Sequence, residues 1–213
     1  MLDKILELIF PNVCGICGRI NKNSLCPKCT VKLKKLIKAN IIKVKNKNFS
    51  NLAYLFKYGG IIREKIIKYK FKDQAYLYET FAKIITKNKK ICGFIKKYDI
   101  IIPVPIHKKR FKQRGYNQSE LLARKIAKTL EIPMAKDVLI KDINNTPQSK
   151  LSKIERKNNA IGVYKTINIH KIKHKRIILI DDIYTTGSTA NECSKMLKQA
   201  GASEIAVLTI AKD

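Results

Sequence analysis

The 213-residue sequence contains no tryptophan, only 16 acidic residues and no long hydrophobic run. Its longest apolar stretches, such as 100–104 and 177–180, are far shorter than the roughly 20 residues that a membrane-spanning helix requires. The first ten residues carry acidic side chains within an apolar stretch and lack a small-residue cleavage site, so they predict a short amphipathic helix rather than a secretory signal. We therefore expect a cytoplasmic protein without a membrane span, in which thiols stay reduced.

The scarcity of acidic residues leaves a formal net charge of +29, because lysine and arginine together number 45. Seven of these are arginine, and the excess charge is spread along the whole chain without a basic tail. Two interpretations stay open. The charge attracts nucleic acid, phosphorylated metabolites or an anionic surface, or it reflects the lysine-rich composition that an AT-rich genome gives to any protein. Charge alone therefore does not identify a ligand.

Short apolar segments alternate with amphipathic ones from residue 51 onward. Strands are expected at 51–58, 99–104, 138–141, 177–180 and 204–210, and helices at 60–71, 74–86, 117–130 and 187–200. Such alternation is typical of an α/β fold whose parallel sheet is flanked by helices on both faces. Before it, a helix is expected from Thr30 to about Ala39, and the Lys- and Asn-rich stretch 43–50 predicts a linker at a domain boundary.

The most informative segment follows the strand expected at 177–180. Asp181 and Asp182 come first, and a hydroxyl-rich loop then leads into a helix; the loop contains Thr185, Thr186, Gly187, Ser188 and Thr189. Hydroxyl and N–H groups at a helix N-terminus suit a phosphate, whereas carboxylates accept hydrogen bonds from sugar hydroxyls or bind an associated Mg2+. We therefore predict a site for a ribose 5-phosphate unit. The simpler alternative is a helix N-terminus capped by serine and threonine, and the absence of Walker spacing disfavours ATP hydrolysis of that type.

A second strand end, after residues 100–104, leads into a loop rich in cations. These cations are Lys108, Lys109, Arg110 and Arg114, and they precede a helix expected to start near Asn117. Cations at the end of a strand would suit a pyrophosphate with its Mg2+; the alternative is that they are ordinary surface residues of a lysine-rich chain. His107, in the same loop, either polarises a leaving group or caps a turn.

Four of the six cysteines lie within sixteen residues as two Cys-x2-Cys pairs, namely Cys14, Cys17, Cys26 and Cys29. This spacing predicts a tetrahedral zinc site, and because all four ligands are cysteine the metal would be structural. Two disulfides or a redox pair are the alternative, which a reducing compartment disfavours. Cys92 and Cys193 have no partner in this pattern, and we expect Cys193 to pack as a small apolar residue.

The motifs resemble, in their order along the chain, those of the ComF group of competence-associated phosphoribosyltransferase-like proteins. The similarity lies in the cysteine module, Pro-Val-Pro at 103–105, Arg-Gly-Tyr-Asn-Gln at 114–118, Thr-Pro-Gln at 146–148 and the loop after Asp182. It implies a type I phosphoribosyltransferase-like parallel sheet with a small N-terminal zinc-ribbon module. The implied division is a zinc module at 1–42 and a phosphoribosyltransferase-like domain at 51–213, whose hood comprises 51–90.

The resemblance also implies a ligand and residue roles. The ligand is phosphoribosyl pyrophosphate (PRPP) with Mg2+, whose ribose hydroxyls would meet Asp181 and Asp182. A long loop at 142–159 would close over it, with Gln148 and Arg156 as candidate contacts, and Arg156 would join the two aspartates in catalysis. If active, the protein transfers a phosphoribosyl group by loss of pyrophosphate through an oxocarbenium-like state.

The family name further implies a role in DNA uptake beside a helicase partner. The alternative function is therefore a single-stranded DNA-binding accessory factor with a non-catalytic PRPP site. Residues 68–72 alternate lysine with aromatic side chains, as in proteins that bind single strands, and Tyr54, Phe56 and Tyr58 add further rings. The simpler interpretation of each ring is a position in the core.

Overall fold

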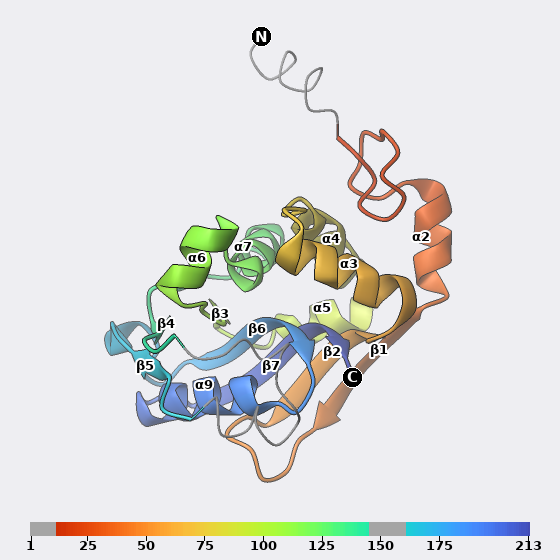
Figure 1. Ribbon diagram of the computed structural model, residues 1–213. Helices are drawn as coiled ribbons and strands as arrows, with labels where there is room; N and C mark the ends of the chain where they lie inside the picture. Colours follow the sequence, from red (N-terminus) through yellow and green to blue (C-terminus); the bar gives the residue numbers. More distant parts are fainter. Residues whose placement is uncertain (1–11, 145–160) are drawn as a thin grey trace.

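The computed structural model describes residues 12–144 and 161–213. A five-stranded sheet with the order β1-β2-β7-β6-β3 forms its centre (Figure 1). The strands are β1 (Ile37–Lys43), β2 (Asn51–Lys57), β7 (Glu204–Lys212), β6 (Arg176–Tyr184) and β3 (Ile100–Pro103). Neighbouring strands run parallel, except that β1 pairs antiparallel with β2 at one edge. The predicted α/β fold with a parallel sheet is confirmed.

The interior position of β6 explains its apolar first half. Its neighbours are β3 on one side and β7 on the other, with Ile177 in register with both Ile100 and Ile205. The four residues from Ile177 to Ile180 are all 0% exposed. A strand that is covered on both faces has no polar face to solvate, so its sequence loses the alternation of a half-exposed strand.

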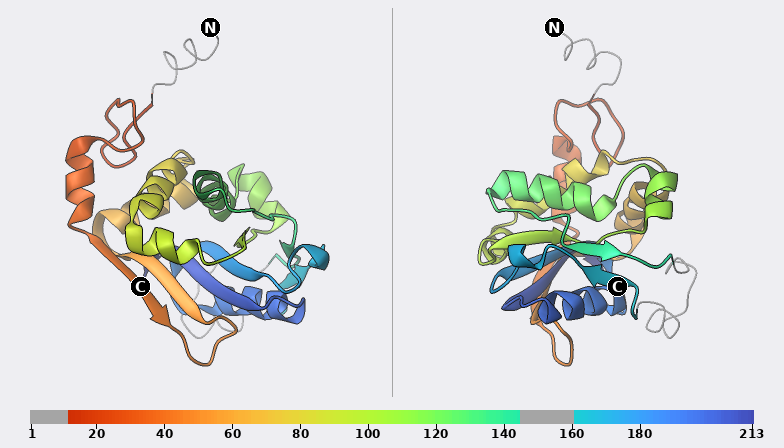
Figure 2. Two further views of the ribbon diagram at one scale, coloured as in Figure 1. Left: turned by 180° about the vertical axis from the view of Figure 1, so that it is seen from behind. Right: turned by 90° about the vertical axis from the view of Figure 1, so that its left-hand side faces the viewer.

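Two helical layers cover the sheet (Figure 2). The first layer contains α3 (Gly60–Phe71), α4 (Leu77–Lys87), α5 (Lys89–Ile95) and α7 (Gln118–Leu130), which pack into one hydrophobic core. The second core lies on the other face under α9 (Ser188–Gln199), where Cys193 is 0% exposed, as expected. None of the helices in the described ranges is long and apolar enough to cross a membrane.

The chain leaves neighbouring strands toward opposite faces of the sheet. After β3 it reaches α7 in the first layer, whereas after β6 it enters α9 in the second layer. At such a switch point the two connections separate beyond the carboxyl ends of the strands and leave a crevice. Smaller elements surround this crevice: α6 (Lys108–Arg114), the antiparallel pair β4 (Leu139–Lys141) and β5 (Tyr164–Thr166), and the 3-10 turn η2 (Ile169–Lys171).

The structure corrects the expected course of the chain before residue 51. The prediction of a helix that reaches Ala39 was wrong. The helix α2 (Pro27–Lys34) ends earlier, and the isoleucine-rich β1 follows it as a strand of the main sheet. Isoleucine favours a pleated surface, and pairing with β2 decides the outcome. The expected linker at 43–50 is the turn between β1 and β2, in which Val44 N–H donates to Ser50 O (2.9 Å). The sheet therefore starts at Ile37, whereas a separately folding module before it stays a prediction.

Two further differences concern the site. The strand β6 continues to Tyr184, so the two aspartates lie within it rather than after it. The cation-rich segment expected to be a loop is helical, as α6, with His107 as its N-cap: His107 Nδ1 accepts from Lys109 N–H at 3.2 Å. This contact confirms the interpretation of His107 as a capping residue.

Candidate functional site

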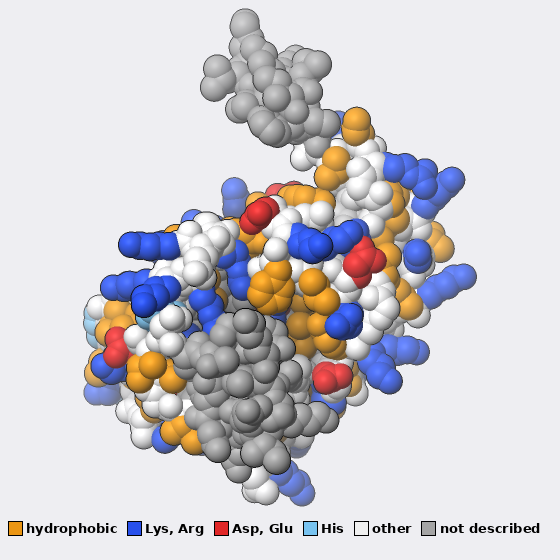
Figure 3. All heavy atoms as spheres, in the orientation of Figure 1, with side chains coloured by type: hydrophobic (Ala, Val, Ile, Leu, Met, Phe, Trp, Pro, Cys, Tyr) orange, Lys and Arg blue, Asp and Glu red, His pale blue; other side chains and the backbone are white. Residues whose placement is uncertain are grey.

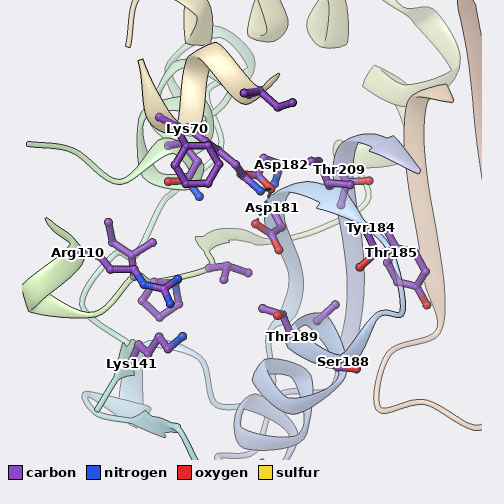
Figure 4. Close-up of a pocket in the computed structure, with 18 of the residues that line it drawn as sticks. Lys70, Arg110, Lys141, Asp181, Asp182, Tyr184, Thr185, Ser188, Thr189 and Thr209 are labelled. Atoms are coloured by element: carbon purple, nitrogen blue, oxygen red, sulfur yellow. Dashed lines mark hydrogen bonds and ion pairs between the residues drawn. The ribbon is translucent and has the colours of Figure 1, made fainter. Parts of the chain in front are cut away.

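A cavity of about 750 Å³ lies beyond the carboxyl ends of β3 and β6, in the crevice between the two helical layers (Figure 4). The hood helix α3, the short helix α6 and the β4–β5 pair supply the remaining walls. Eight of the residues predicted for the site line this cavity: Asp181, Asp182, Thr185, Gly187, Ser188, Thr189, Arg110 and Arg114. Residues that are up to 79 positions apart in the sequence thus line the same cavity.

Asp182 is the most buried charged group of the cavity. Its side chain is 3% exposed, and its Oδ1 lies 2.8 Å from Nζ of Lys70, which belongs to α3. Its Oδ2 is buried and has no hydrogen-bond partner among the described residues. A buried carboxylate oxygen without a partner is costly, and a ligand that donates a hydrogen bond to it or binds it as a cation would remove that cost.

Asp181 points into the cavity beside Asp182 (Figure 4). Its Oδ1 accepts from Ser119 Oγ (3.1 Å) at the start of α7 and from Asp182 N–H (2.9 Å). Burial and the neighbouring charge of Asp182 nevertheless raise the pKa of Asp181 from its ordinary value of 3.8 to about 7, against the lowering effect of Lys70. Among the described residues, the two acidic groups thus have one ion pair, from Lys70 to Asp182.

The loop between β6 and α9 has the conformation that an anion site needs. Gly187 has φ +74°, and a Cβ at this position would lie 2.3 Å from the hydroxyl oxygen of Tyr184, so both conformation and space require glycine. The first turn of the 12-residue helix α9 opens directly toward the cavity. Ser188 and Thr189, the first residues of this helix, line the cavity, and the dipole at a helix N-terminus favours negative charge there.

Thr186 differs from the other loop residues. Its Oγ1 lies 2.8 Å from Ser188 Oγ, and its side chain is not part of the cavity lining in the described structure. In this structure its hydroxyl bonds within the loop, and its predicted contact with the ligand stays a prediction.

The wall opposite the loop is cationic. Arg110 of α6 and Lys141 at the end of β4 face the cavity (Figure 4), and Arg114 of α6 also lines it. Burial and the nearby Arg110 lower the pKa of Lys141 to about 8. The Arg114 guanidinium lies 5.3 Å from the ring centre of Phe71, in a cation–π contact. Three cations facing an anion loop form a second region suited to negative charge.

Not every predicted residue reaches the cavity. Lys108 and Lys109 belong to α6 but are not among the described lining residues, since that short helix turns only Arg110, Gln113 and Arg114 inward. Gln148 and Arg156, and with them most of the loop expected at 142–159, lie outside the described residues. Their proposed contacts with the ligand stay predictions.

Several site residues were not predicted as site residues. They are Lys70, Ser119, Lys141, Tyr184 and Thr209. Thr209 reaches the site because β7 pairs with β6 and places it in register with Asp181. Strand register and helix packing are not readable from local sequence, although Lys141 does end a strand that the sequence predicted.

The aromatic and lysine residues at 68–72 have separate roles. Tyr69 is 0% exposed and donates its hydroxyl to Gln118 O (2.5 Å), so it belongs to the core. Phe56 is also buried, at 1% exposure. Lys70 and Phe71 line the cavity instead. The segment is thus part of the hood and not a continuous platform for stacked bases.

The four clustered cysteines come together at the N-terminal end of the described chain, above α4 in Figure 1. All four Sγ atoms lie within 4.8 Å of one another, and those of Cys17 and Cys26 are 3.9 Å apart. A tetrahedral site with zinc–sulfur bonds of ~2.3 Å separates its sulfurs by ~3.8 Å, so the donor set fits zinc. Burial raises the pKa of Cys14, but N–H groups of the surrounding backbone outweigh burial and lower it to about 6.

We call residues 12–29 the cysteine knuckle. It is fixed to α4 through Thr80, which is 0% exposed and donates its hydroxyl to Ser24 O (2.7 Å). Gly15 lies so close to Thr80 that a Cβ would be 2.3 Å from the threonine hydroxyl. The knuckle and the hood side of the sheet are therefore packed together.

Comparison with known proteins agrees with this architecture. The phosphoribosyl transferase domain family matches residues 117–213, which contain α7, β6, the loop and α9. Competence protein F of Haemophilus influenzae is 32% identical over 151 residues, a match that spans 69% of this chain and 66% of that protein's length. Competence protein ComFC of Bacillus subtilis is 27% identical over 97% of this chain and 80% of its own.

A third relative has a different name. The DNA utilization protein YhgH of Escherichia coli is 22% identical over 94% of this chain and 90% of its own length. The competence relatives, the phosphoribosyl transferase domain match and the order of motifs along the chain agree, and the chain therefore belongs to the ComF family of phosphoribosyltransferase-like proteins.

Proposed function

We propose that the cavity binds PRPP with Mg2+ and that the protein uses this ligand in DNA uptake during natural competence. The observation that carries the proposal is the acid pair on β6 directly beside the anion loop at the start of α9, with Asp182 Oδ2 buried and without a hydrogen-bond partner in the described part of the chain. The carboxylate pair lies near the end of β6, and the anion site follows in the loop directly after that strand. Together they match the two ends of a ribose 5-phosphate, its hydroxyls and its phosphate.

The ligand's 5-phosphate would lie at the loop, where N–H and hydroxyl groups of Ser188 and Thr189 donate to its oxygens. The ribose hydroxyls would then donate to Asp181 and Asp182. Lys70 holds Asp182 Oδ1 in the ligand-free protein, so a ribose hydroxyl has the second oxygen, Oδ2, as its acceptor. The acid pair would hold the sugar and keep its C1 turned toward the cationic wall.

The pyrophosphate would lie against Arg110, Arg114 and Lys141. Mg2+ would supply charge neutralisation of the phosphate oxygens when bound. In a transfer reaction the bond between ribose C1 and the pyrophosphate oxygen breaks, the electron pair leaves with the pyrophosphate, and a lone pair of the acceptor's nucleophilic atom forms the new bond to C1. The cationic wall stabilises this leaving group, and the carboxylates oppose the positive charge that develops on the sugar ring.

The cysteine knuckle would hold one structural zinc through Cys14, Cys17, Cys26 and Cys29. The described part of the knuckle is too small to bury a core of its own, so the metal would supply much of its folding free energy. Its place on α4 makes it a support of the hood rather than part of the ligand cavity.

The association with DNA rests on relatives. Three of them are named competence proteins or a DNA utilization protein, and the match to YhgH covers nearly the whole chain. Such a role is compatible with phosphoribosyl transfer and also with a site that binds PRPP without turnover, so the experiment has to separate binding from chemistry.

Calorimetric titration of the full chain with PRPP, with and without Mg2+, tests binding, and a pyrophosphate-release assay against a panel of bases and ammonia tests chemistry. We expect Mg2+-dependent binding that weakens about a hundredfold or more in Asp181→Asn plus Asp182→Asn, since charged hydrogen bonds are each worth about 1.5–3 kcal/mol. Asp137→Asn, at an exposed site bound to Lys171, is the matched control. Unchanged PRPP binding in the double variant would refute the proposed site.

A further inference from the structure

Helix α3 of the hood places one cation, Lys70, directly against the acid pair. Its Nζ lies 2.8 Å from Asp182 Oδ1, and the two side chains are 23% and 3% exposed. Water screens a pair at this depth poorly, so its geometry matters more than that of a surface pair. Lys70 is thus part of the site, unlike the many exposed lysines of the chain.

The position of Lys70 is fixed by its two neighbours in the sequence. Tyr69 is 0% exposed and donates its hydroxyl to Gln118 O (2.5 Å) at the start of α7. Phe71 lies under the guanidinium of Arg114, 5.3 Å from the ring centre, on α6. Three consecutive residues at the end of α3 therefore contact α7, β6 and α6. This anchoring holds the lysine ammonium at the acid pair.

With Lys70 in place, the acid pair offers little to a free divalent cation. Mg2+ demands about six oxygen ligands at ~2.1 Å in near-octahedral geometry. Asp182 Oδ1 faces the lysine ammonium, and Asp181 Oδ1 accepts from Ser119 Oγ and Asp182 N–H. The ammonium would also repel a cation bound to Asp182. A sugar hydroxyl brings no charge and needs one acceptor, which Asp182 Oδ2 provides, since it has no partner among the described residues.

The charge of the whole chain acts in the same direction. The formal net charge is +29, and Figure 3 shows Lys and Arg side chains spread over the face that it draws, with few acidic ones between them. A positive potential of this kind lowers the local concentration of free cations. A polyphosphate carries more negative charge than one Mg2+ neutralises, so it is attracted by the same potential with the ion bound to it.

We propose that Lys70 determines the specificity of the acid pair: it excludes a free divalent cation and leaves the two carboxylates to the ribose hydroxyls. For its ligand this role rests on the proposed function, whereas the exclusion of the cation does not. It decides between the two partners that the sequence left open for these aspartates, a sugar or a metal ion. Mg2+ then enters with the pyrophosphate, and ribose 5-phosphate, which lacks pyrophosphate, binds without Mg2+.

The test measures Mn2+, as a probe for Mg2+, by electron paramagnetic resonance with the full chain supplied with zinc and no phosphorylated ligand. The variant is Lys70→Met, and the control is Lys68→Met on the same helix, where Lys68 Nζ lies 2.8 Å from the exposed Glu64. We expect Lys70→Met to bind one Mn2+ at least about tenfold more tightly than the wild type, because a cation beside the carboxylates is removed. The control should change Mn2+ affinity less than about twofold, and Lys70→Arg, which keeps the cation, should behave as the wild type.

Two further measurements complete the design. Adding Asp182→Asn to Lys70→Met should abolish the gained Mn2+ site. Calorimetric titration of the wild type with ribose 5-phosphate should give the same affinity with Mg2+ and in metal-depleted buffer, whereas PRPP should require Mg2+. Urea unfolding of each variant shows whether it is folded.

Several results would overturn the role of Lys70. Wild-type protein that binds Mn2+ as tightly as Lys70→Met, with a loss in Asp182→Asn, would show that the lysine does not exclude the ion; this comparison of wild type with Asp182→Asn stands even where Lys70→Met does not fold. An equal gain in Lys68→Met would assign the effect to net charge. A strict Mg2+ requirement for ribose 5-phosphate would give the carboxylates to the metal. Failure of both phosphorylated ligands to bind would refute the proposed function alone, because the Mn2+ measurement uses neither.

Discussion

Replacing Asp181 by asparagine should make the ligand-free protein more stable. Burial and the adjacent Asp182 raise the pKa of Asp181 to about 7 in the folded protein, whereas an unfolded aspartate titrates near its ordinary value of 3.8. Asparagine removes the charge and keeps a carbonyl oxygen that can still accept from Ser119 Oγ and Asp182 N–H. The carboxylate that we propose for ligand binding therefore lowers the stability of the folded protein when no ligand is bound.

The size of this cost depends on pH in a defined direction. Below about pH 4 the group is protonated in both states and costs nothing. Between pH 4 and 7 the unfolded chain releases the proton while the folded protein retains it, so stability falls as pH rises. Above pH 7 both are ionised, and the difference between about 7 and 3.8 corresponds to about 4 kcal/mol, at 1.36 kcal/mol per pH unit.

Urea unfolding of the wild type and Asp181→Asn at pH 5 and pH 8 measures this difference. We expect the variant to be more stable than the wild type by about 1–2 kcal/mol at pH 5 and by about 4 kcal/mol at pH 8, so that the gap between the two proteins widens by about 2–3 kcal/mol, with similar m-values. Asp137→Asn is the control, because hydrogen bonding to Lys171 lowers the pKa of that exposed carboxyl, so its replacement should not stabilise the protein and its effect should not vary between pH 5 and 8.

A loss of stability in Asp181→Asn at pH 8, or a gap that is the same at both pH values, would refute the reasoning. Either result would mean that Lys70 and Ser119 compensate the buried charge fully. The Asp181 carboxylate would then carry no uncompensated charge that a ligand's hydroxyl donors could stabilise.

Two further predictions concern the anion loop and the knuckle. Gly187→Ala should weaken PRPP binding more than about tenfold and destabilise the fold by about 1–3 kcal/mol, because it strains a positive φ and displaces Tyr184. Calorimetric titration and urea unfolding measure the two effects. In the same experiments the control Gly93→Ala, in α5 with open space around it, should leave binding unchanged. Cys17→Ser should lower the zinc content measured by metal analysis and the melting temperature, whereas Cys92→Ser should retain the metal; equal zinc in both variants would refute the four-cysteine site.

The parts of the site that sequence could predict are those carried by contiguous residues. The strand that carries the two aspartates, the hydroxyl loop and the glycine before α9 are local features, because a strand, a turn and a helix N-terminus each impose their own residue types over a few positions. The cysteine spacing is local in the same sense, since a turn brings each Cys-x2-Cys pair to one point.

The residues that were missed depend on contacts between distant segments. Lys70 reaches Asp182 only because α3 packs over the end of β6, and Ser119 meets Asp181 because α7 starts at the end of β3. The prediction of a helix at 30–39 was wrong for a related reason: its last residues, from Ile37, belong to β1, which pairs with β2, and tertiary pairing overrides a local preference. A sequence pattern indicates the secondary structure that a segment prefers, whereas the packing of the sheet and helices determines which distant residues come into contact.

The distribution of arginine bears on the question that the net charge left open. Three of the seven arginines, Arg63, Arg110 and Arg114, line the cavity, whereas Lys70 and Lys141 are the only lysines among its described lining residues. A compositional drift toward lysine would replace arginine wherever a positive charge alone is enough. Arginine would persist where its planar, two-pronged donor geometry matters, as it does for phosphate oxygens. The abundant surface lysine is therefore consistent with composition, and the arginine at the cavity is the part of the charge that points to a phosphorylated ligand.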